Sequence, residues 1–215
     1  MTPGAVLELR ASKANSGLTQ GINSPLTTIW TDTSGNNNNG TLTNFGATTA
    51  SGWAGAGTTG DPYRAVFDGS GYVSHPTVAL SATASTCEYW LRPADFATVR
   101  VLHLDSYPYL YVALRSTYVR LRTTTAINEW AVPEISTSEL THIVITRNGG
   151  YSFAYKNGLA SSTGPIAIST DLNLVALGKY SEAVYQWKGD IVLARIYPYA
   201  LSAAQVAANY AAGAN

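Results

Sequence analysis

Apolar and polar side chains alternate with a period of two along most of the chain after residue 62. This period is typical of β-strands that bury one face of a sheet. In residues 86–91, Glu88 and Trp90 share one face, and the more apolar face consists of Cys87, Tyr89 and Leu91. Comparable patterns predict further strands at residues 99–104, 109–114, 118–122, 140–147, 151–156, 172–177 and 190–197.

Turn and helix signals complete this pattern. Asn148-Gly149-Gly150 and Asn157-Gly158 are typical hairpin turns. One helix is predicted at residues 203–211, because Ser202 and Gln205 have the spacing of a capping box and Gly213 follows as a C-terminal stop.

Residues 31–60 are rich in Thr, Ser, Asn and Gly, yet large apolar side chains recur in and beside this stretch. They are Trp30, Leu42, Phe45 and Trp53. A disordered linker has few such residues, so we expect short strands joined by structured loops. Many short strands with frequent turns predict an all-β fold, namely a two-sheet antiparallel jelly-roll sandwich with one short C-terminal helix. We expect residues 1–215 to form a single domain.

Charge and composition exclude several classes of partner. Thirteen basic and thirteen acidic residues cancel, and only 12% of residues are charged, so we expect no nucleic-acid partner. No apolar run reaches the ~20 residues of a membrane span, so we expect no membrane insertion. Met1 is followed by Thr-Pro-Gly, and no signal peptide is recognised. Cys87 is the only cysteine, which excludes an intrachain disulfide.

The arrangement of acidic and nucleophilic residues argues against catalysis. Glucanases with a sandwich fold place paired carboxylates two positions apart on one strand, and no two acids here have that spacing. No serine is flanked by glycines in a nucleophile elbow. We interpret His142 as a packed, hydrogen-bonded histidine and Cys87 as a buried, inert thiol. The chain is therefore predicted not to be an enzyme.

Residues 107–130 contain the strongest binding signal. A hairpin at Arg115-Ser116-Thr117 would bring two outward rows together, with Leu110, Val112, Leu114, Val119 and Leu121 facing inward. The predicted carbohydrate-binding residues are Tyr109, Tyr111, Tyr118, Arg120 and Arg122, with Trp130 at the border. Tyrosine rings suit sugar C–H surfaces, and arginine forks suit hydroxyls or carboxylates. Alternatively, this face is covered by a loop or by an oligomer contact.

Several segments, in the right order, are similar to motifs of the laminin-G-like, concanavalin A-like lectin/glucanase jelly rolls. They are residues 30–41 (W-x-D-x-S-G-N-x-N-x-G-T), 67–73 (F-D-G-x-x-D-Y-V), 87–93 (I-E-A-W-V-K-P), 140–147 (W-T-H-V-A-V-T-R), 155–158 (Y-V-N-G) and 188–202 (K-G-D-I-x-x-x-R-I-Y-x-x-A-L-S). The resemblance implies the jelly-roll fold and covers nearly the whole chain. Gly71 and Leu140 replace an acidic residue and a tryptophan that are usual in these motifs.

The missing acid at Gly71 affects the metal expectation. Asp32 and Asp68 could contribute carboxylate oxygens to a calcium ion, but calcium needs several oxygens. We prefer the interpretation that each aspartate caps its own turn, and we expect no cofactor.

Three functions remain open at this point. The first is a non-catalytic carbohydrate-binding or adhesion module of a bacterial surface or phage virion protein, whose partner is a glycan or cell-surface polysaccharide. The second is a structural or decoration domain that contacts neighbouring proteins, and the third is a degenerate glycoside hydrolase. For the first, we expect an extracellular, cell-surface or virion location.

Overall fold

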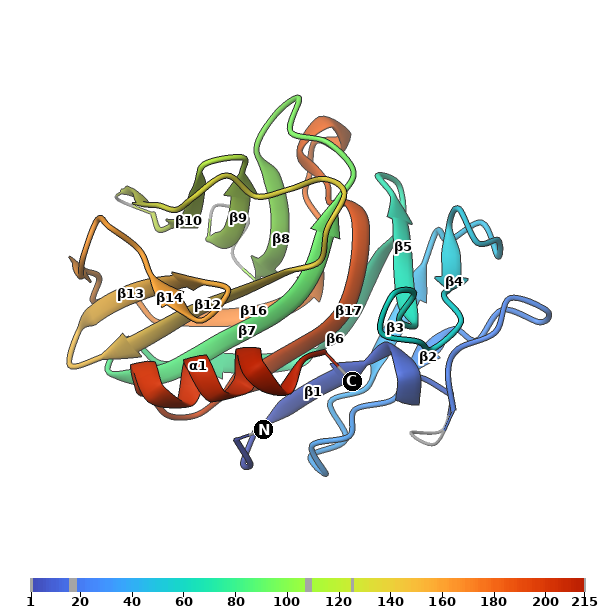
Figure 1. Ribbon diagram of the computed structural model, residues 1–215, viewed down its shortest axis with the longest axis horizontal. Coiled ribbons are helices and arrows are strands. Elements are labelled where there is room, and N and C mark those ends of the chain that lie inside the picture. The colour runs from blue at the N-terminus through green and yellow to red at the C-terminus, as the bar shows by residue number, and fades with distance from the viewer. Residues whose placement is uncertain (1, 16–18, 107–109, 125, 215) are drawn as a thin grey trace.

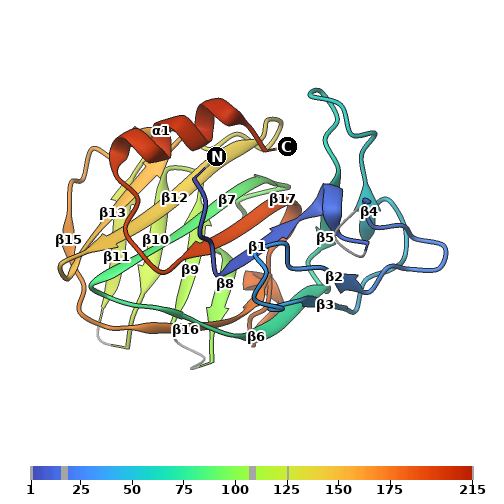
Figure 2. The ribbon, with the colours of Figure 1, turned by 90° about the horizontal axis from the view of Figure 1, so that it is seen from below.

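The computed structural model describes residues 2–15, 19–106, 110–124 and 126–214. Two antiparallel sheets pack face to face, and the one α-helix found in these ranges lies on the outer face of one of them (Figures 1 and 2). The predicted jelly-roll class is confirmed. No helix in these ranges combines the length and the apolar character that crossing a membrane requires.

The first sheet has nine strands in the described part of the chain. In spatial order they are β14 (Leu159–Ala160), β13 (Tyr151–Lys156), β12 (Thr141–Asn148), β7 (Ala84–Pro93), β17 (Lys188–Tyr197), β5 (Arg64–Asp68) and β4 (Gly52–Ala54), with β1 (Leu7–Arg10) paired to β17 and β15 (Ile166–Ala167) paired to β13.

The second sheet has eight strands over the same ranges. Their order is β11 (Ile127–Ala131), β10 (Tyr118–Arg122), β9 (Tyr111–Arg115), β8 (Arg100–Asp105), β16 (Leu172–Leu177), β6 (Tyr72–Leu80), β3 (Gly40–Thr43) and β2 (Ile29–Trp30). The remaining elements are the 3-10 helices η1 (Ala11–Lys13) and η2 (Ala183–Tyr185), and the α-helix α1 (Ala203–Ala212).

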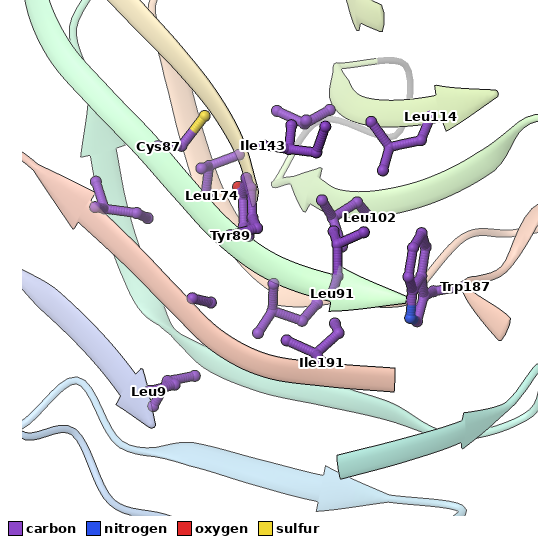
Figure 3. Packing of buried hydrophobic residues seen from close by; sticks show 14 of the residues in the cluster. Leu9, Cys87, Tyr89, Leu91, Leu102, Leu114, Ile143, Leu174, Trp187 and Ile191 are labelled. Atoms are coloured by element: carbon purple, nitrogen blue, oxygen red, sulfur yellow. The ribbon is translucent and has the colours of Figure 1, made fainter. Parts of the chain in front are cut away.

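The core lies between the two sheets and is formed by the inward positions of the alternating strands. Cys87, Tyr89 and Leu91 of β7 are buried there, as their shared parity predicts, together with Leu102 and Leu114 of the opposite sheet (Figure 3). Burial raises the pKa of the Cys87 thiol to about 11, so the prediction of a buried, unreactive cysteine is confirmed.

The outer face of the nine-stranded sheet carries a buried polar network beneath α1. The Glu88 carboxylate accepts hydrogen bonds from His142 Nε2 at 2.8 Å, from the Tyr197 hydroxyl at 3.0 Å and from Asn209 Nδ2 of the helix at 3.2 Å. Arg195 lies 3.6 Å from the same carboxylate. The interpretation of His142 as a packed, hydrogen-bonded residue is confirmed.

The ends of α1 follow the sequence signals. The Ser202 hydroxyl accepts from the Gln205 backbone N–H, and the Gln205 side chain accepts from the Ser202 N–H, so the predicted capping box is confirmed. Gly213 ends the helix at φ +77°, a value that favours glycine. The N-terminal segment is tied to the helix, since the Thr2 backbone N–H donates to Asn209 Oδ1 at 2.8 Å.

Candidate functional site

The hairpin β9–β10 has the predicted register. Tyr111 pairs with Arg122, and Arg115 pairs with Tyr118 across the two-residue turn. The inward row is fully buried, with Val112, Leu114, Val119 and Leu121 each at 0% exposure. The opposite parity therefore lies on the outer face of the eight-stranded sheet.

A cavity of about 450 Å³ opens on this outer face. Its volume is within the range of small-molecule sites. Most of its lining side chains are aromatic or charged, and the full lining is Ala97, Thr98, Val99, Tyr111, Arg115, Arg120, Arg122, Tyr180, Glu182 and Tyr185. Three predicted binding residues, Tyr111, Arg120 and Arg122, are thus brought together.

The segment between β16 and β17 supplies one wall of the cavity. It lies beside β8, to which Gln186 forms a bridge at Val101 (Figure 1). Its Tyr180 and Tyr185 rings meet edge to face, with centroids 5.8 Å apart. The sequence prediction missed these residues. The aromatic spacing within 180–185 was the available signal, but it shows no strand or helix period.

The Tyr111 ring is covered by this wall. It packs edge to face on Tyr180, with centroids 5.3 Å apart, and only 4% of the residue is exposed. At Tyr111 the structure therefore agrees with the alternative interpretation, in which a loop of the same chain covers this face, and an exposed binding ring at this position is ruled out. Both Tyr111 and Tyr185 contribute to the cavity wall, and Tyr185 is half-buried.

Two further predicted residues do not reach the cavity, and one lies outside the described ranges. Trp130 of β11 pairs with the inward-facing Val119, is 0% exposed and packs in the main core, so its predicted border position is wrong. Tyr118 is half-buried beside Arg120, but it is not part of the lining. Tyr109 falls outside the described residues.

Hydrogen bonds hold two of the guanidinium groups in place. Arg120 Nε donates to Glu129 Oε1 at 2.8 Å, and Arg120 Nη2 donates to the Tyr118 hydroxyl at 3.1 Å. Burial lowers the pKa of Arg120, but the hydrogen bond that it donates to Glu129 and the charges of Tyr118 and Glu129 together outweigh burial, and the net pKa is raised. Arg122 Nη1 donates to the Tyr111 hydroxyl at 3.4 Å, and this bond raises the pKa of Arg122. Both side chains are therefore permanent cations.

A second, smaller cavity of about 240 Å³ is lined by two arginines, Arg64 of β5 and Arg92 of β7. Both guanidinium groups pair with the same carboxylate, Asp190, which leaves them less able to attract an anion. No aromatic side chain belongs to its described lining, which is Thr59, Gly60, Asp61, Pro62, Arg64, Arg92, Ser138, Glu139 and Leu140. The cavity on β9 and β10 is therefore the stronger candidate site.

The two aspartates considered for calcium both cap turns. Asp32 accepts backbone N–H bonds from Glu8, Ser34 and Asn38 at 2.8–2.9 Å. Asp68 Oδ1 accepts from the Ser70 N–H at 2.8 Å and from the Gly71 N–H. Burial raises the pKa of Asp68, but these bonds and the Ser70 hydroxyl lower it to about 2. The capping interpretation is confirmed, and the expectation that no calcium ion binds here stays a prediction.

The fold resembles several solved structures at low sequence identity. Domain 4 of AbnA, a GH43 extracellular arabinanase from Geobacillus stearothermophilus, in complex with arabinotriose, aligns over 97% of this chain and 98% of its own, with 20% identity and a TM-score of 0.65. The botulinum neurotoxin serotype D ligand binding domain in complex with N-acetylneuraminic acid aligns over 97% of this chain and 51% of its own, with 13% identity and a TM-score of 0.62.

Trypanosoma rangeli sialidase, in complex with the inhibitor DANA, aligns over 98% of this chain but 33% of its own, with 13% identity and a TM-score of 0.65. These identities support the fold alone. A comparison with curated proteins gives no significant match. A laminin G model described as the Concanavalin A-like lectin/glucanases superfamily matches residues 67–207. The chain therefore belongs to the concanavalin A-like lectin/glucanase superfamily.

Proposed function

We propose that residues 1–215 form one non-catalytic carbohydrate-binding or adhesion module that binds glycan in the cavity on β9 and β10. The observation that carries this proposal is the lining, in which three tyrosines and three arginines surround about 450 Å³. Aromatic side chains pack against the C–H faces of sugar rings, and guanidinium groups donate to their oxygens. The domain carries no broad surface charge that would favour a less specific polymer partner.

The small number of carboxylates at the cavity supports glycan binding rather than glycan hydrolysis. Standard glycoside hydrolysis needs two carboxyl groups on either side of the scissile bond. Glu182 is the single carboxylate in the described lining, and the nearby Glu129 is held by Arg120. We therefore place the chain among the binding members of the superfamily rather than the glucanases.

The solved structures of similar fold agree with this proposal. Two of them contain a sugar, arabinotriose in one and N-acetylneuraminic acid in the other. The first belongs to an extracellular enzyme. We propose a similar setting for this module, as part of an extracellular, cell-surface or virion protein that contacts a glycan or a cell-surface polysaccharide.

A glycan array followed by titration calorimetry tests the proposal. Tyr185→Ala removes a half-buried ring from the cavity wall and should weaken the affinity for an array hit about tenfold. Tyr151→Ala is the matched control, because Tyr151 lies on β13 of the other sheet and is 51% exposed. Equal affinities of the two variants for the same glycan would rule out this cavity as the site.

A further inference from the structure

The segment between β16 and β17 forms one wall of the cavity, but its central turn has no apolar anchor of its own. None of the three residues of η2 is buried, and Val184 in that turn is 51% exposed. Packing holds the segment at its two ends, where Tyr180 lies against Tyr111 and Trp187 is buried in the core. The turn that carries Tyr185 therefore depends on polar contacts for a defined position.

Arg100 makes such contacts with the backbone of this turn. Its Nη1 donates to the Val184 carbonyl at 2.8 Å and to the Gln186 carbonyl at 3.4 Å. The Val184 carbonyl also accepts from the Thr98 hydroxyl at 2.9 Å. Arg100 begins β8, is only 7% exposed and does not belong to the described lining of the cavity. It therefore supports the wall without facing a ligand.

A carboxylate sets the direction of the Arg100 guanidinium. Arg100 Nε donates to Asp95 Oδ1 at 3.1 Å, and Nη2 pairs with the same oxygen. These hydrogen bonds hold the pKa of Asp95 below its ordinary value, so its carboxylate is ionised at neutral pH. Because the Nε and Nη2 edge of the planar guanidinium is occupied in this way, Nη1 is directed toward the carbonyls of the turn.

The Arg100 contacts join two segments that both line the cavity. Residues 97–99 lie between β7 and β8, and Tyr180, Glu182 and Tyr185 lie between β16 and β17. Asp95 and Arg100 flank the first segment, and Arg100 is hydrogen-bonded to the second. A site whose walls are fixed before the ligand arrives loses less conformational entropy on binding.

We infer that Arg100, oriented by Asp95, is a positioning residue of the glycan site, which fixes the η2 turn so that the Tyr185 ring is in place before a glycan binds. This inference rests on the proposed function and adds to it a residue that acts through the wall and touches no sugar. The loss of Arg100 should loosen the wall in the ligand-free protein and weaken glycan binding by the folded protein.

Amide hydrogen exchange of the ligand-free protein measures the first effect. The backbone N–H groups of Tyr185, Gln186 and Trp187 donate to carbonyls within residues 178–187 at 3.1–3.2 Å. Arg100→Gln should speed exchange in a peptide of these residues about tenfold and leave exchange in β12 unchanged. Unchanged exchange in residues 178–187 would overturn the inference. Faster exchange throughout the chain would do so as well, because it would indicate a role in global stability alone.

Arg10→Gln is the matched control for this experiment. Arg10 is also 7% exposed, pairs with the Glu8 carboxylate and donates to the Ala214 carbonyl at 3.0 Å, but it is outside the described lining of the cavity. Its replacement removes the same kinds of contact at another place. Exchange in residues 178–187 and glycan affinity should therefore equal those of the parent protein.

Titration calorimetry measures the second effect. The probes are arabinotriose, N-acetylneuraminic acid and the tightest-binding glycan of the array. Arg100→Gln should weaken the affinity for a bound probe about tenfold at unchanged stoichiometry. A residue that only stabilises the fold would instead lower the stoichiometry, because fewer molecules would be folded.

Asp95→Asn provides a second, milder variant, because the Asp95 side chain is 36% exposed. It should change exchange and affinity in the same direction as Arg100→Gln, by a smaller factor. The double variant should lose no more affinity than Arg100→Gln alone, since Asp95 acts through Arg100. Losses that add in the double variant would overturn the assigned role of Asp95.

The two proposals fail in different ways. If a probe binds and Tyr185→Ala weakens it, whereas Arg100→Gln binds like the parent protein, the glycan site stands and the positioning role is wrong. If no probe binds at millimolar concentration, the proposed function is wrong and the positioning role with it.

Discussion

Glu88→Gln is the most direct test of the polar network under α1. The wild-type carboxylate is fully buried and receives hydrogen bonds from His142, Tyr197 and Asn209, with Arg195 close by. Glutamine has nearly the same shape, but it keeps only one acceptor oxygen and loses the negative charge. Its amide N–H₂ would therefore face groups that are themselves donors.

The expected cost follows from the contacts that remain. Breaking a buried ion pair by removing one partner costs about 3–5 kcal/mol. Arg195 keeps its bond to Glu8 at 2.8 Å, and the His142 ring can move its proton to Nδ1, which has no partner among the described atoms. Both effects reduce the penalty, so we expect a loss of about 3 kcal/mol in the free energy of unfolding. For a domain of this size that loss lowers Tm by roughly 6–12 °C.

Urea denaturation and calorimetry of the parent protein and the variant measure this loss. Glu134→Gln makes the same chemical change at an exposed position and should change the unfolding free energy by less than about 0.5 kcal/mol. Glycan affinity of the folded Glu88→Gln protein should equal that of the parent. A destabilisation below about 1 kcal/mol would refute the reasoning, because it would mean that the carboxylate charge is not needed by its four neighbours.

Two more predictions concern pH and metal removal. His75 Nε2 and His103 Nε2 lie 2.8 Å apart in the core, and burial lowers both histidine pKa values, so the unfolded chain binds more protons than the folded one below about pH 6.5. The unfolding free energy should therefore fall as pH drops from 7 to 5. In a series of denaturation measurements over this range, His103→Gln should make the fall with pH shallower. An unfolding free energy that stays level or increases toward pH 5 would contradict the lowered pKa values of the two histidines. EDTA should lower Tm only slightly, because backbone N–H groups already occupy Asp32 and Asp68, and a drop of more than about 10 °C would demonstrate a calcium site.

Strand alternation predicted the elements well where one face is clearly apolar. The bounds expected for β10, β13 and β16 agree with the structure. The edge strand β11 was not recognised, because its apolar Ile127 points outward and is 55% exposed. Recognising that strand would have placed Trp130 opposite Val119 and therefore in the core.

The candidate site was predicted only in part, for a different physical reason. Strand parity shows which side chains share a face, but it does not show which distant segment covers that face. Arg120 and Arg122 line the cavity on the face that strand parity predicts. Covering of this face by a loop was one of the alternatives, but nothing in the sequence indicates that the covering loop is the one that contains Tyr180. The covering segment follows β16 and has no period of its own from which to predict its path.

The residues that resemble the family and the residues that line the cavity are separate sets. Glu88, His142, Arg195 and Tyr197 all lie in the quoted motifs, and together they hold the sheet, the helix and the N-terminal strand. None of the described lining residues, which fall within 97–122 and 180–185, lies in those motifs. A fold-level match therefore reports the scaffold, whereas the proposed site is formed by segments between the motifs. Variants should divide in the same way: Glu88→Gln should lower stability without changing the affinity of the folded protein, and Arg115→Gln should lower affinity without lowering stability.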